Sequence, residues 1–328
     1  MKTLLIFMTL LFISGTARAE LKFRNNGTFR IAQITDVHHK LNHSNATEAL
    51  TNLGIVLDKV KPDLIFFTGD IVVDQSMKQA WNEVIGLAIQ RNIPWAVTFG
   101  NHDDENGSTR VEIMNYLRSL PLCLAVDGPG SVAGVGNYFL RVESSERNAT
   151  AAILYALDSH SYSPETIEQE KYGYFDFSQV DWYRTVSRQL TQENNGKPYP
   201  ALAFFHIPLR EYGLLNDSLK YTRIGSRLET ECYGALNTGM YAAMFESGDI
   251  MATFAGHDHL NDYIGRLNTI CLAYGRFSGS STTYGHLPTG IRVIELLENE
   301  RAFRTWISDT VDERVYPAFF NNNRLISE

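Results

Sequence analysis

Eight polar residues of the sequence combine the side chains and the spacing of a metal centre. Each follows a short apolar run: Asp36, His38, Asp70, Asn101, His102, His206, His257 and His259. Carboxylate and imidazole groups suit zinc, manganese or iron. In the Asp-x-His and His-x-His segments that begin at Asp36 and His257, alternate residues of an extended chain face the same side, so each segment can offer two ligands. Two neighbouring metal ions need a bridging carboxylate, and Asp70 is the natural bridge.

The elements that would position these residues alternate between strands and helices. Apolar runs predict strands at 29–35, 64–67 and 95–99, and helical spacing predicts helices at 46–60 and 77–91. This order implies parallel strands joined by crossover helices. Ligands bind at the carboxyl ends of such strands, so polar groups that are far apart in the sequence should converge there.

The second half of the chain is richer in strands. The expected strands and helices are 137–142, 151–157, 178–192 (helix), 201–205, 236–246 (helix), 250–254, 270–275, 290–297 and 302–308. The segment 207–249 is otherwise an elaborated loop, and loops of that length inside a compact domain tend to be functional. No Pro/Ser/Gly-rich linker divides the chain, so we expect one domain over residues 20–328.

The first nineteen residues have the plan of a secretory signal peptide. A basic start at Lys2 is followed by a short apolar run and by an Ala17-x-Ala19 cleavage site. The apolar run is too short for a membrane span of about 20 residues. We therefore expect an exported protein, periplasmic, secreted or within the secretory pathway, without stable membrane insertion.

The formal net charge of −8 restricts the partners. Removal of Lys2 and Arg18 with the signal peptide would make it −10. Nucleic-acid affinity comes mainly from Lys and Arg that neutralise phosphates, so nucleic acid is not an expected partner. A small phosphorylated molecule remains compatible with this charge, and no protein partner is inferred.

Three cysteines leave two readings open. One disulfide plus a free thiol would suit an exported protein, with Cys232 and Cys271 as the favoured pair. Alternatively, all three, including Cys123, are small buried hydrophobic residues. There is no Cys-x-x-Cys, so a zinc finger or a redox motif is absent from the sequence.

Five motifs in order resemble the calcineurin-like metallophosphoesterase superfamily. They are DVH (36–38), GDIV (69–72), GNHD (100–103), HIP (206–208) and GHDH (256–259). The match extends over about residues 29–295. The resemblance implies an α/β fold, a four-layer α/β/β/α sandwich of two mixed β-sheets flanked by helices, with metal-binding loops at one edge of both sheets.

The resemblance also implies a ligand set. The first metal would take Asp36, His38, Asp70 and His259, and the second would take Asp70, Asn101, His206 and His257. In this family the histidine of GNHD is not a ligand. His102 would therefore stabilise or protonate the leaving oxygen, with Asp103 orienting it.

Within the superfamily the chain is most similar to the purple-acid-phosphatase-like branch of exported enzymes. The similar segments are HIPLREY (206–212), ECYGALNTGMYAAMFESGDI (231–250), GHDHLNDY (256–263) and YGRFSGS (274–280). Purple acid phosphatases carry a tyrosine three residues after the bridging aspartate, which binds ferric iron and gives the colour. Val73 occupies that position here. An Fe(III)-tyrosinate centre is therefore not expected, and Fe, Mn or Zn could form the pair.

The implied function is hydrolysis of phosphate monoesters by attack of a metal-bound hydroxide. The alternatives are a phosphodiesterase for nucleotide or lipid-headgroup substrates and a non-catalytic protein that retains its metals. Two further residues are candidates for substrate contact. His39 adjoins a ligand but could equally point away, and Arg276 could bind phosphate or form a structural salt bridge.

Overall fold

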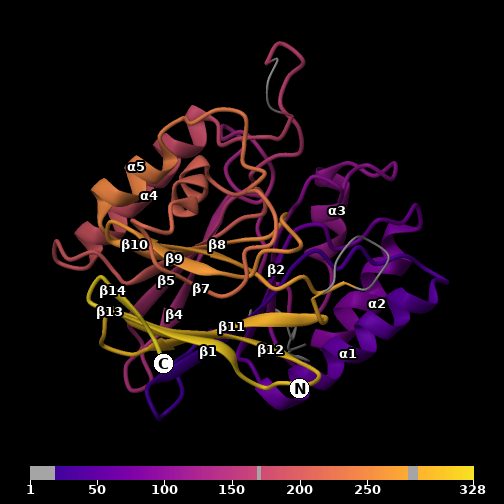
Figure 1. Cartoon of the computed structure of the whole chain (residues 1–328), viewed down its shortest axis with the longest axis horizontal. Coiled ribbons are helices and arrows are strands. Elements are labelled where there is room, and N and C mark those ends of the chain that lie inside the picture. The colour runs from indigo at the N-terminus through magenta and orange to yellow at the C-terminus, as the bar shows by residue number, and fades with distance from the viewer. Residues whose placement is uncertain (1–18, 168–170, 280–286) are drawn as a thin grey trace, which may run out of the picture.

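The computed structural model describes residues 19–167, 171–279 and 287–328 (Figure 1). All but the last residue of the expected signal peptide lie outside these ranges. Within them, no helix is long and apolar enough to cross a membrane. The described elements form two sheets of seven strands each, with helices on their outer faces.

The first sheet carries the amino-terminal motifs. Its strands lie in the order β14 (Arg324–Ser327), β13 (Val315–Asn321), β12 (Ala302–Asp309), β11 (Gly290–Leu297), β1 (Thr28–Ile34), β2 (Leu64–Thr68) and β3 (Trp95–Thr98). As predicted, β1, β2 and β3 are parallel, with Ile31 opposite Leu64 and Ile65 opposite Trp95. The other pairs in this sheet are antiparallel, so the sheet is mixed.

The second sheet carries the remaining motifs. Its strands lie in the order β4 (Tyr138–Glu143), β5 (Thr150–Ala156), β6 (Ala201–Phe204), β8 (Ile250–Ala255), β10 (Ile270–Tyr274), β9 (Ile264–Leu267) and β7 (Arg223–Ile224). The four strands from β5 to β10 in this order are parallel, and the outer strands pair antiparallel. The expected pairing of 137–142 with 151–157 is confirmed.

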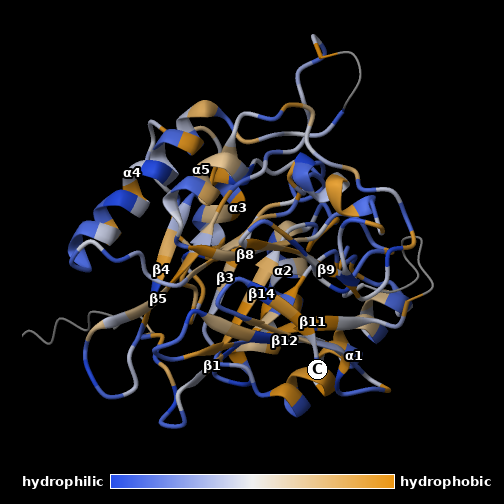
Figure 2. Cartoon of the chain, turned by 60° about the vertical axis from the view of Figure 1, so that its left-hand side comes forward, coloured by the Kyte–Doolittle hydropathy of each residue, from blue (hydrophilic) through white to orange (hydrophobic). Residues whose placement is uncertain are grey.

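The helices cover the outer faces of the two sheets. Helices α1 (Ser44–Val60), α2 (Met77–Ile89) and α3 (Arg110–Leu117) belong to the first half of the chain, and α4 (Phe177–Glu193) and α5 (Met240–Ser247) to the second. Figure 1 shows α1 and α2 on one side of the paired sheets and α4 and α5 on the other. Figure 2 shows apolar strands in the interior and polar outer faces on the helices. The expected four-layer α/β/β/α sandwich is confirmed.

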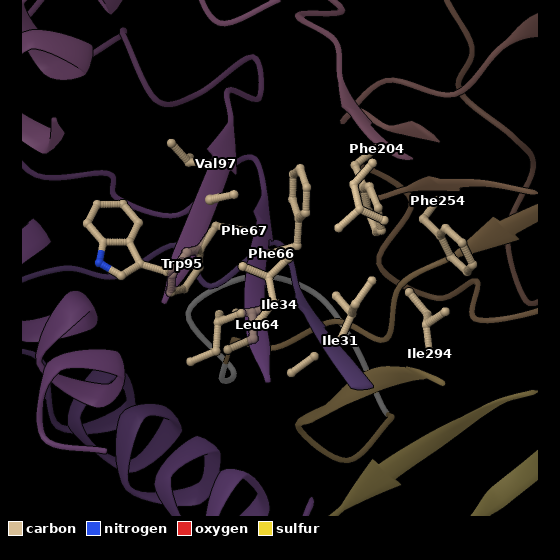
Figure 3. Close-up of a cluster of buried hydrophobic side chains, with 14 of the residues drawn as sticks. Ile31, Ile34, Leu64, Phe66, Phe67, Trp95, Val97, Phe204, Phe254 and Ile294 are labelled. Atoms are coloured by element: carbon tan, nitrogen blue, oxygen red, sulfur yellow. The ribbon is translucent and has the colours of Figure 1, made fainter. Parts of the chain in front are cut away.

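Aromatic side chains join the two sheets in the core (Figure 3). The Phe66 ring of β2 stacks on the Phe204 ring of β6 with centroids 4.0 Å apart. Phe204 in turn stacks on Phe254 of β8 at 5.3 Å. All three side chains are fully buried, and such pairs add about 0.5–1.5 kcal/mol each beyond their burial. The core therefore fixes the spacing between the strands whose ends carry the polar residues.

The structure departs from the sequence expectations in a few elements. The pattern did not predict α3, the short strands β7 and β9, the carboxyl-terminal hairpin β13–β14 or the 3₁₀-helix Arg210–Asn216. The expected helix at 236–246 begins later, at Met240, because Gly239 has φ = 91° and interrupts the helix there. The expected helix at 46–60 begins earlier, at Ser44, after the N-cap His43, which makes no side-chain hydrogen bond.

The cysteines match neither of the two readings in full, because Cys123 is half-buried and only Cys271 is buried. The described residues include all three cysteines and contain no disulfide. Cys271 is buried in β10, whereas Cys232 is exposed in the loop before α5. The favoured pairing of Cys232 with Cys271 is therefore not formed.

Candidate metal centre

The polar residues after five strands meet because backbone pairing continues beyond the strand ends. The Asp36 amide donates to the Gly69 carbonyl at 3.0 Å, and the His38 amide donates to the Asp70 carbonyl at 3.0 Å. Between the sheets, the His257 amide donates to both oxygens of the Asp36 carboxylate at 3.1 Å. This last contact joins the loop after β8 to the loop after β1, and the two sheets thus share one polar edge.

Asp36, His38 and His259 form the first cluster that could hold a metal ion. All three are buried, and one ligand atom from each lies within 4.8 Å of the others. The Nε2 atoms of His38 and His259 face each other at 3.3 Å, and His259 Nε2 lies 3.4 Å from Asp36 Oδ1. Two imidazole nitrogens and a carboxylate oxygen that converge in this way are a ligand set suited to zinc, manganese or iron.

Asp70, His206 and His257 form the second cluster. His206 Nδ1 donates to the Thr68 carbonyl at 2.8 Å, which leaves Nε2 facing Asp70 Oδ2 at 3.1 Å. A hydrogen bond from the second ring nitrogen to a carbonyl is the usual way to orient a metal-binding histidine. His257 Nε2 is buried without a hydrogen-bond partner among the described residues. A buried nitrogen of this kind is free to bind a cation.

Asp70 lies between the two clusters. Its Oδ2 atom is 3.1 Å from His206 Nε2 in the second cluster and 3.8 Å from His38 Nε2 in the first. Its other oxygen, Oδ1, accepts the His102 amide at 2.8 Å. The side chain is therefore fixed with one oxygen directed at both clusters, the position that a bridging ligand requires.

Asn101 supplies a further unsatisfied group. Its Oδ1 atom is buried without a hydrogen-bond partner in the described part of the chain. Its Nδ2 atom donates to the Tyr162 hydroxyl at 3.3 Å. A buried amide oxygen without a donor is costly unless a cation binds to it. The residues present therefore fit two metal ions.

The backbone is strained at four of the predicted ligands. Asp36, His38, Asp70 and His257 have φ values of 54°, 47°, 53° and 79°. Residues other than glycine rarely adopt this left-handed region, and each such residue costs about 1–3 kcal/mol. Strain of this kind concentrates at functional sites, and here it turns the side chains of consecutive loops toward one another.

Two glycines permit the close approach of the loops. A Cβ atom on Gly100 would lie 2.2 Å from Asp70 Oδ1 and 2.5 Å from the Asp70 nitrogen. Gly69 has φ = 86°, and a Cβ atom there would lie 2.5 Å from the Gly100 nitrogen. The glycines of the GD and GNHD motifs are thus required by the contact between the loops after β2 and β3.

Burial and mutual charge shift the pKa values of the imidazoles in opposite directions. Burial lowers the pKa of His38 to about 4 and that of His257 to about 3, so both imidazoles are neutral at neutral pH, the form that can bind a metal ion. Burial also opposes the charge on His206, but the carboxylates of Asp70 and Asp36 outweigh it and raise the pKa of His206 to about 9. In the metal-free chain a proton on His206 takes the place of a cation.

Asp103 serves a different purpose from the expected one. Its carboxylate accepts backbone amides from Gly100 at 2.7 Å, Ile71 at 2.8 Å and Asp70 at 2.9 Å. It therefore ties the loop after β3 to the loop after β2. Burial, with the nearby charge of Asp70, raises the pKa of Asp103 to about 6.

The partner of His102 is Glu105. His102 Nδ1 lies 2.6 Å from Glu105 Oε2, and the His102 ring lies 5.5 Å from the His38 ring. The expected orientation of His102 by Asp103 is thus replaced by a contact with Glu105. The physical reason is that the tight turn after β3 directs Asp103 inward to unpaired backbone amides and leaves Glu105, three residues after His102, on the side of the imidazole.

Neither candidate for substrate contact faces the two clusters. His39 is buried, and its Nε2 lies 2.8 Å from Glu83 Oε2 of α2. Arg276 is buried and donates twice to Asp262 Oδ2, at 2.8 Å and 2.5 Å. For His39 this is the alternative in which the side chain points away, and for Arg276 it is the structural salt bridge. Both residues support the loops that carry the proposed ligands.

The sequence did not single out two residues that hold the site together. Tyr162 is separated from Asn101 by 61 positions, and no sequence signal marked it. Arg110 donates to the Gly100 carbonyl at 2.6 Å and pairs with Asp104 and the buried Asp158. Its position as the first residue of α3, a helix that was not predicted, concealed this role.

Comparisons with known proteins show the family of the chain. The family model described as calcineurin-like phosphoesterase matches residues 29–261. An Arabidopsis thaliana protein named "Probable inactive purple acid phosphatase 29" is 36% identical over 295 residues, covering 80% of this chain and 75% of that protein. The protein "Phosphatase DCR2" of Saccharomyces cerevisiae is 31% identical, covering 89% of this chain and 55% of that protein.

Solved structures share the fold. A dimetal phosphatase from Danio rerio superposes with a TM-score of 0.60 at 14% identity, covering 89% of this chain and 98% of that one. The purple acid phosphatase PPD1 of yellow lupin gives a TM-score of 0.52 at 10% identity, covering 88% and 52%. With the five motifs, the two facing clusters and a family model that spans most of its length, the chain belongs to the calcineurin-like phosphoesterase family.

Proposed function

We propose that the protein hydrolyses phosphate monoesters at a centre of two metal ions. The observation that carries the proposal is the position of Asp70, with one oxygen directed at both His/Asp clusters. The first ion would be held by Asp36, His38, Asp70 and His259, and the second by Asp70, Asn101, His206 and His257. When bound, two such ions activate a water molecule and neutralise charge on the phosphoryl oxygens.

The residues around the metal centre would orient the ligands and supply the proton for the leaving group. The Asp70 carboxylate is held by the His102 amide, which donates to Oδ1. The Asn101 amide is held by its Nδ2 atom, which donates to the Tyr162 hydroxyl. His102 is half-exposed beside the first cluster, where its Nε2 can give a proton to the departing alkoxide or phenoxide. Asp103 stabilises the loops and takes no part in the proton transfer.

The metal pair would lack a tyrosinate ligand. Val73, whose amide donates to the His39 carbonyl at 3.0 Å, stands where purple acid phosphatases have their tyrosine. The remaining donor set of imidazole, carboxylate and amide oxygen suits Fe, Mn or Zn. We infer that the loaded protein has no purple charge-transfer colour.

Two other functions are the alternatives to this proposal. The site geometry would serve a phosphodiester of a nucleotide or a lipid headgroup as well as a monoester. The name of the 36% identical Arabidopsis relative includes "inactive", which favours a protein that binds metals without catalysis. The complete set of ligand positions in this chain supports an active centre instead.

Export is a further part of the proposal. A signal peptide at residues 1–19 would deliver a domain that begins near Glu20 to the secretory pathway or the periplasm. An exported enzyme would act on small phosphorylated substrates outside the cytosol. The amino-terminal sequence of the protein purified from its host would establish whether cleavage follows Ala19.

One experiment separates the three functions. The purified protein is stripped of metal, reloaded in turn with Mn²⁺, Zn²⁺ and Fe²⁺, and analysed for bound metal. Each form is then assayed with p-nitrophenyl phosphate and with bis-p-nitrophenyl phosphate. We expect two ions per chain and faster hydrolysis of the monoester. Faster hydrolysis of the diester would establish a phosphodiesterase, and two bound ions without any hydrolysis would establish a binding protein.

A further inference from the structure

Three hydrogen bonds connect Asn101 to His102 through two residues outside the family motifs. Asn101 Nδ2 donates to the Tyr162 hydroxyl at 3.3 Å. The Tyr162 hydroxyl donates to Glu105 Oε1 at 2.6 Å, and His102 Nδ1 donates to Glu105 Oε2 at 2.6 Å. The chain thus runs from a proposed ligand of the second metal to the proposed proton donor.

We propose that Tyr162 and Glu105 are positioning residues that fix the Asn101 amide for the metal and the His102 imidazole for the leaving group. This inference rests on the proposed function, because it assigns the two residues to the same site. Neither Tyr162 nor Glu105 would touch the substrate phosphorus or the metals. They act through the two residues that do.

The direction of each hydrogen bond follows from the donors and acceptors available. A carboxylate only accepts, so both the Tyr162 hydroxyl proton and the His102 Nδ1 proton must point to Glu105. The Tyr162 oxygen then has only lone pairs left, and it can accept only the amide nitrogen of Asn101. The whole chain therefore has one consistent arrangement of protons.

That arrangement determines the state of both end residues. The Asn101 amide is oriented with Nδ2 toward Tyr162, which leaves Oδ1, buried and without a partner among the described residues, for the cation. Glu105 holds the Nδ1 proton of the His102 imidazole, so the proton given to the leaving oxygen is a second one, carried on Nε2. Loss of the Tyr162 hydroxyl would therefore loosen both the Asn101 amide and the His102 imidazole.

Aromatic packing holds Tyr162 against the second cluster. The Tyr162 ring stacks on the Tyr172 ring with centroids 6.2 Å apart, and the two residues form an isolated β-bridge. The Tyr172 ring meets the His257 ring edge-on at 4.2 Å. Tyr162 is therefore supported by a residue that itself rests on a proposed ligand, while its hydroxyl reaches Glu105 and Asn101.

The test compares Tyr162→Phe and Glu105→Gln with the control Tyr172→Phe. The first variant removes the hydroxyl and keeps the ring. Glutamine at 105 has one acceptor oxygen and can replace only one of the two that the carboxylate offers. The control removes the hydroxyl of the stacked tyrosine, which is not part of the hydrogen-bonded chain. Metal affinity of the stripped protein is measured by calorimetry with Mn²⁺ and Zn²⁺, and hydrolysis is measured with p-nitrophenyl and phenyl phosphate.

The variants should differ in a defined pattern. Tyr162→Phe should weaken the more weakly bound ion by about tenfold or more, as is typical when the partner of a ligand is lost. Both Tyr162→Phe and Glu105→Gln should slow phenyl phosphate hydrolysis about tenfold more than p-nitrophenyl phosphate hydrolysis. Glu105→Gln should leave metal affinity nearly unchanged, and Tyr172→Phe should change neither property. A Tyr162→Phe variant that behaves like Tyr172→Phe in both measurements would overturn the inference.

A readout that does not depend on turnover separates this inference from the proposed function. Nitrogen-15 NMR of labelled histidines reports the tautomer of His102. A Nδ1-protonated ring in the wild type that is lost in Glu105→Gln supports the inference even if no ester is hydrolysed, in which case only the proposed function fails. A His102 ring protonated on Nε2 alone in the wild type overturns the inference even if the protein is an active phosphatase.

Discussion

His206 Nδ1 lies 2.8 Å from the carbonyl oxygen of Thr68, the last residue of β2. Because a carbonyl only accepts, Nδ1 carries the proton, and Nε2 faces Asp70. A contact between the second sheet and the first thus determines the ring orientation of a proposed ligand. The same contact is possible only because Gly69 leaves room beside His206: a Cβ atom there would lie 2.6 Å from His206 Nδ1.

Metal binding should release protons near neutral pH. The carboxylates beside His206 overcome the effect of burial and raise its pKa to about 9, so the metal-free protein carries a proton that a cation must displace. Calorimetric titration with Zn²⁺ at pH 7.5, in two buffers of different ionisation enthalpy, should show net proton release. His206→Gln should release fewer protons than the wild type.

The raised pKa of His206 also predicts how the stability of the metal-free protein depends on pH. A folded-state value of about 9 against 6.5 for an ordinary histidine means that the stabilisation is complete below about pH 6.5 and is lost as the pH rises through about 9. Urea denaturation of the metal-free protein should therefore show its midpoint falling across this window. An equally steep fall in His206→Gln would contradict the assignment.

His102→Ala should slow hydrolysis without affecting metal binding. General acid catalysis contributes about 10²–10⁴-fold when the leaving group is poor and little when it is good. We expect a loss of about a hundredfold or more for an alkyl phosphate and less than about tenfold for p-nitrophenyl phosphate. Metal content, measured by atomic absorption, should equal that of the wild type. Equal losses with both esters would remove His102 from its proposed role.

Gly100→Ala should prevent metal binding. The new methyl group would occupy the space of Asp70 Oδ1, only 2.2 Å away, and would push the proposed bridging carboxylate out of position. We expect fewer than two bound ions per chain and no measurable hydrolysis. Gly86→Ala in α2 is the matched control, because its Cβ atom would meet only Gln90 Nε2 at 3.8 Å. That control should bind metal normally and be more stable by about 0.5–1 kcal/mol.

Arg276→Ala should affect stability and leave substrate binding unchanged. Its side chain is 3% exposed and pairs with the buried Asp262, and the loss of one partner of such a pair costs about 3–5 kcal/mol. We expect a lower denaturation midpoint with an unchanged KM. Arg91→Ala, which breaks the exposed pair with Asp58, should cost about 1 kcal/mol or less. A raised KM with an unchanged denaturation midpoint would instead show that Arg276 binds substrate.

The sequence by itself determined most of the strands and helices and the residues that meet at the strand ends. Short apolar runs followed by Asp, Asn or His predicted β1, β2, β3, β6 and β8, and the parallel order predicted that their ends would converge. Such patterns are local, and a buried parallel strand is recognised by its own composition. The hairpin β13–β14 escaped prediction because Pro317 interrupts the apolar run of β13 and most of β14 is exposed.

Only the tertiary structure decided how each polar side chain is used. Asp103, Glu105, His39 and Arg276 are all polar residues within or near the motifs, and nothing in their spacing distinguishes a partner of His102 from an anchor of the backbone. The difference depends on atoms from distant segments, such as the Ile71 amide for Asp103 and the Asp262 carboxylate for Arg276. Hydrogen bonds act over about 3 Å, so their partners exist only after the two sheets have packed and brought the loops together.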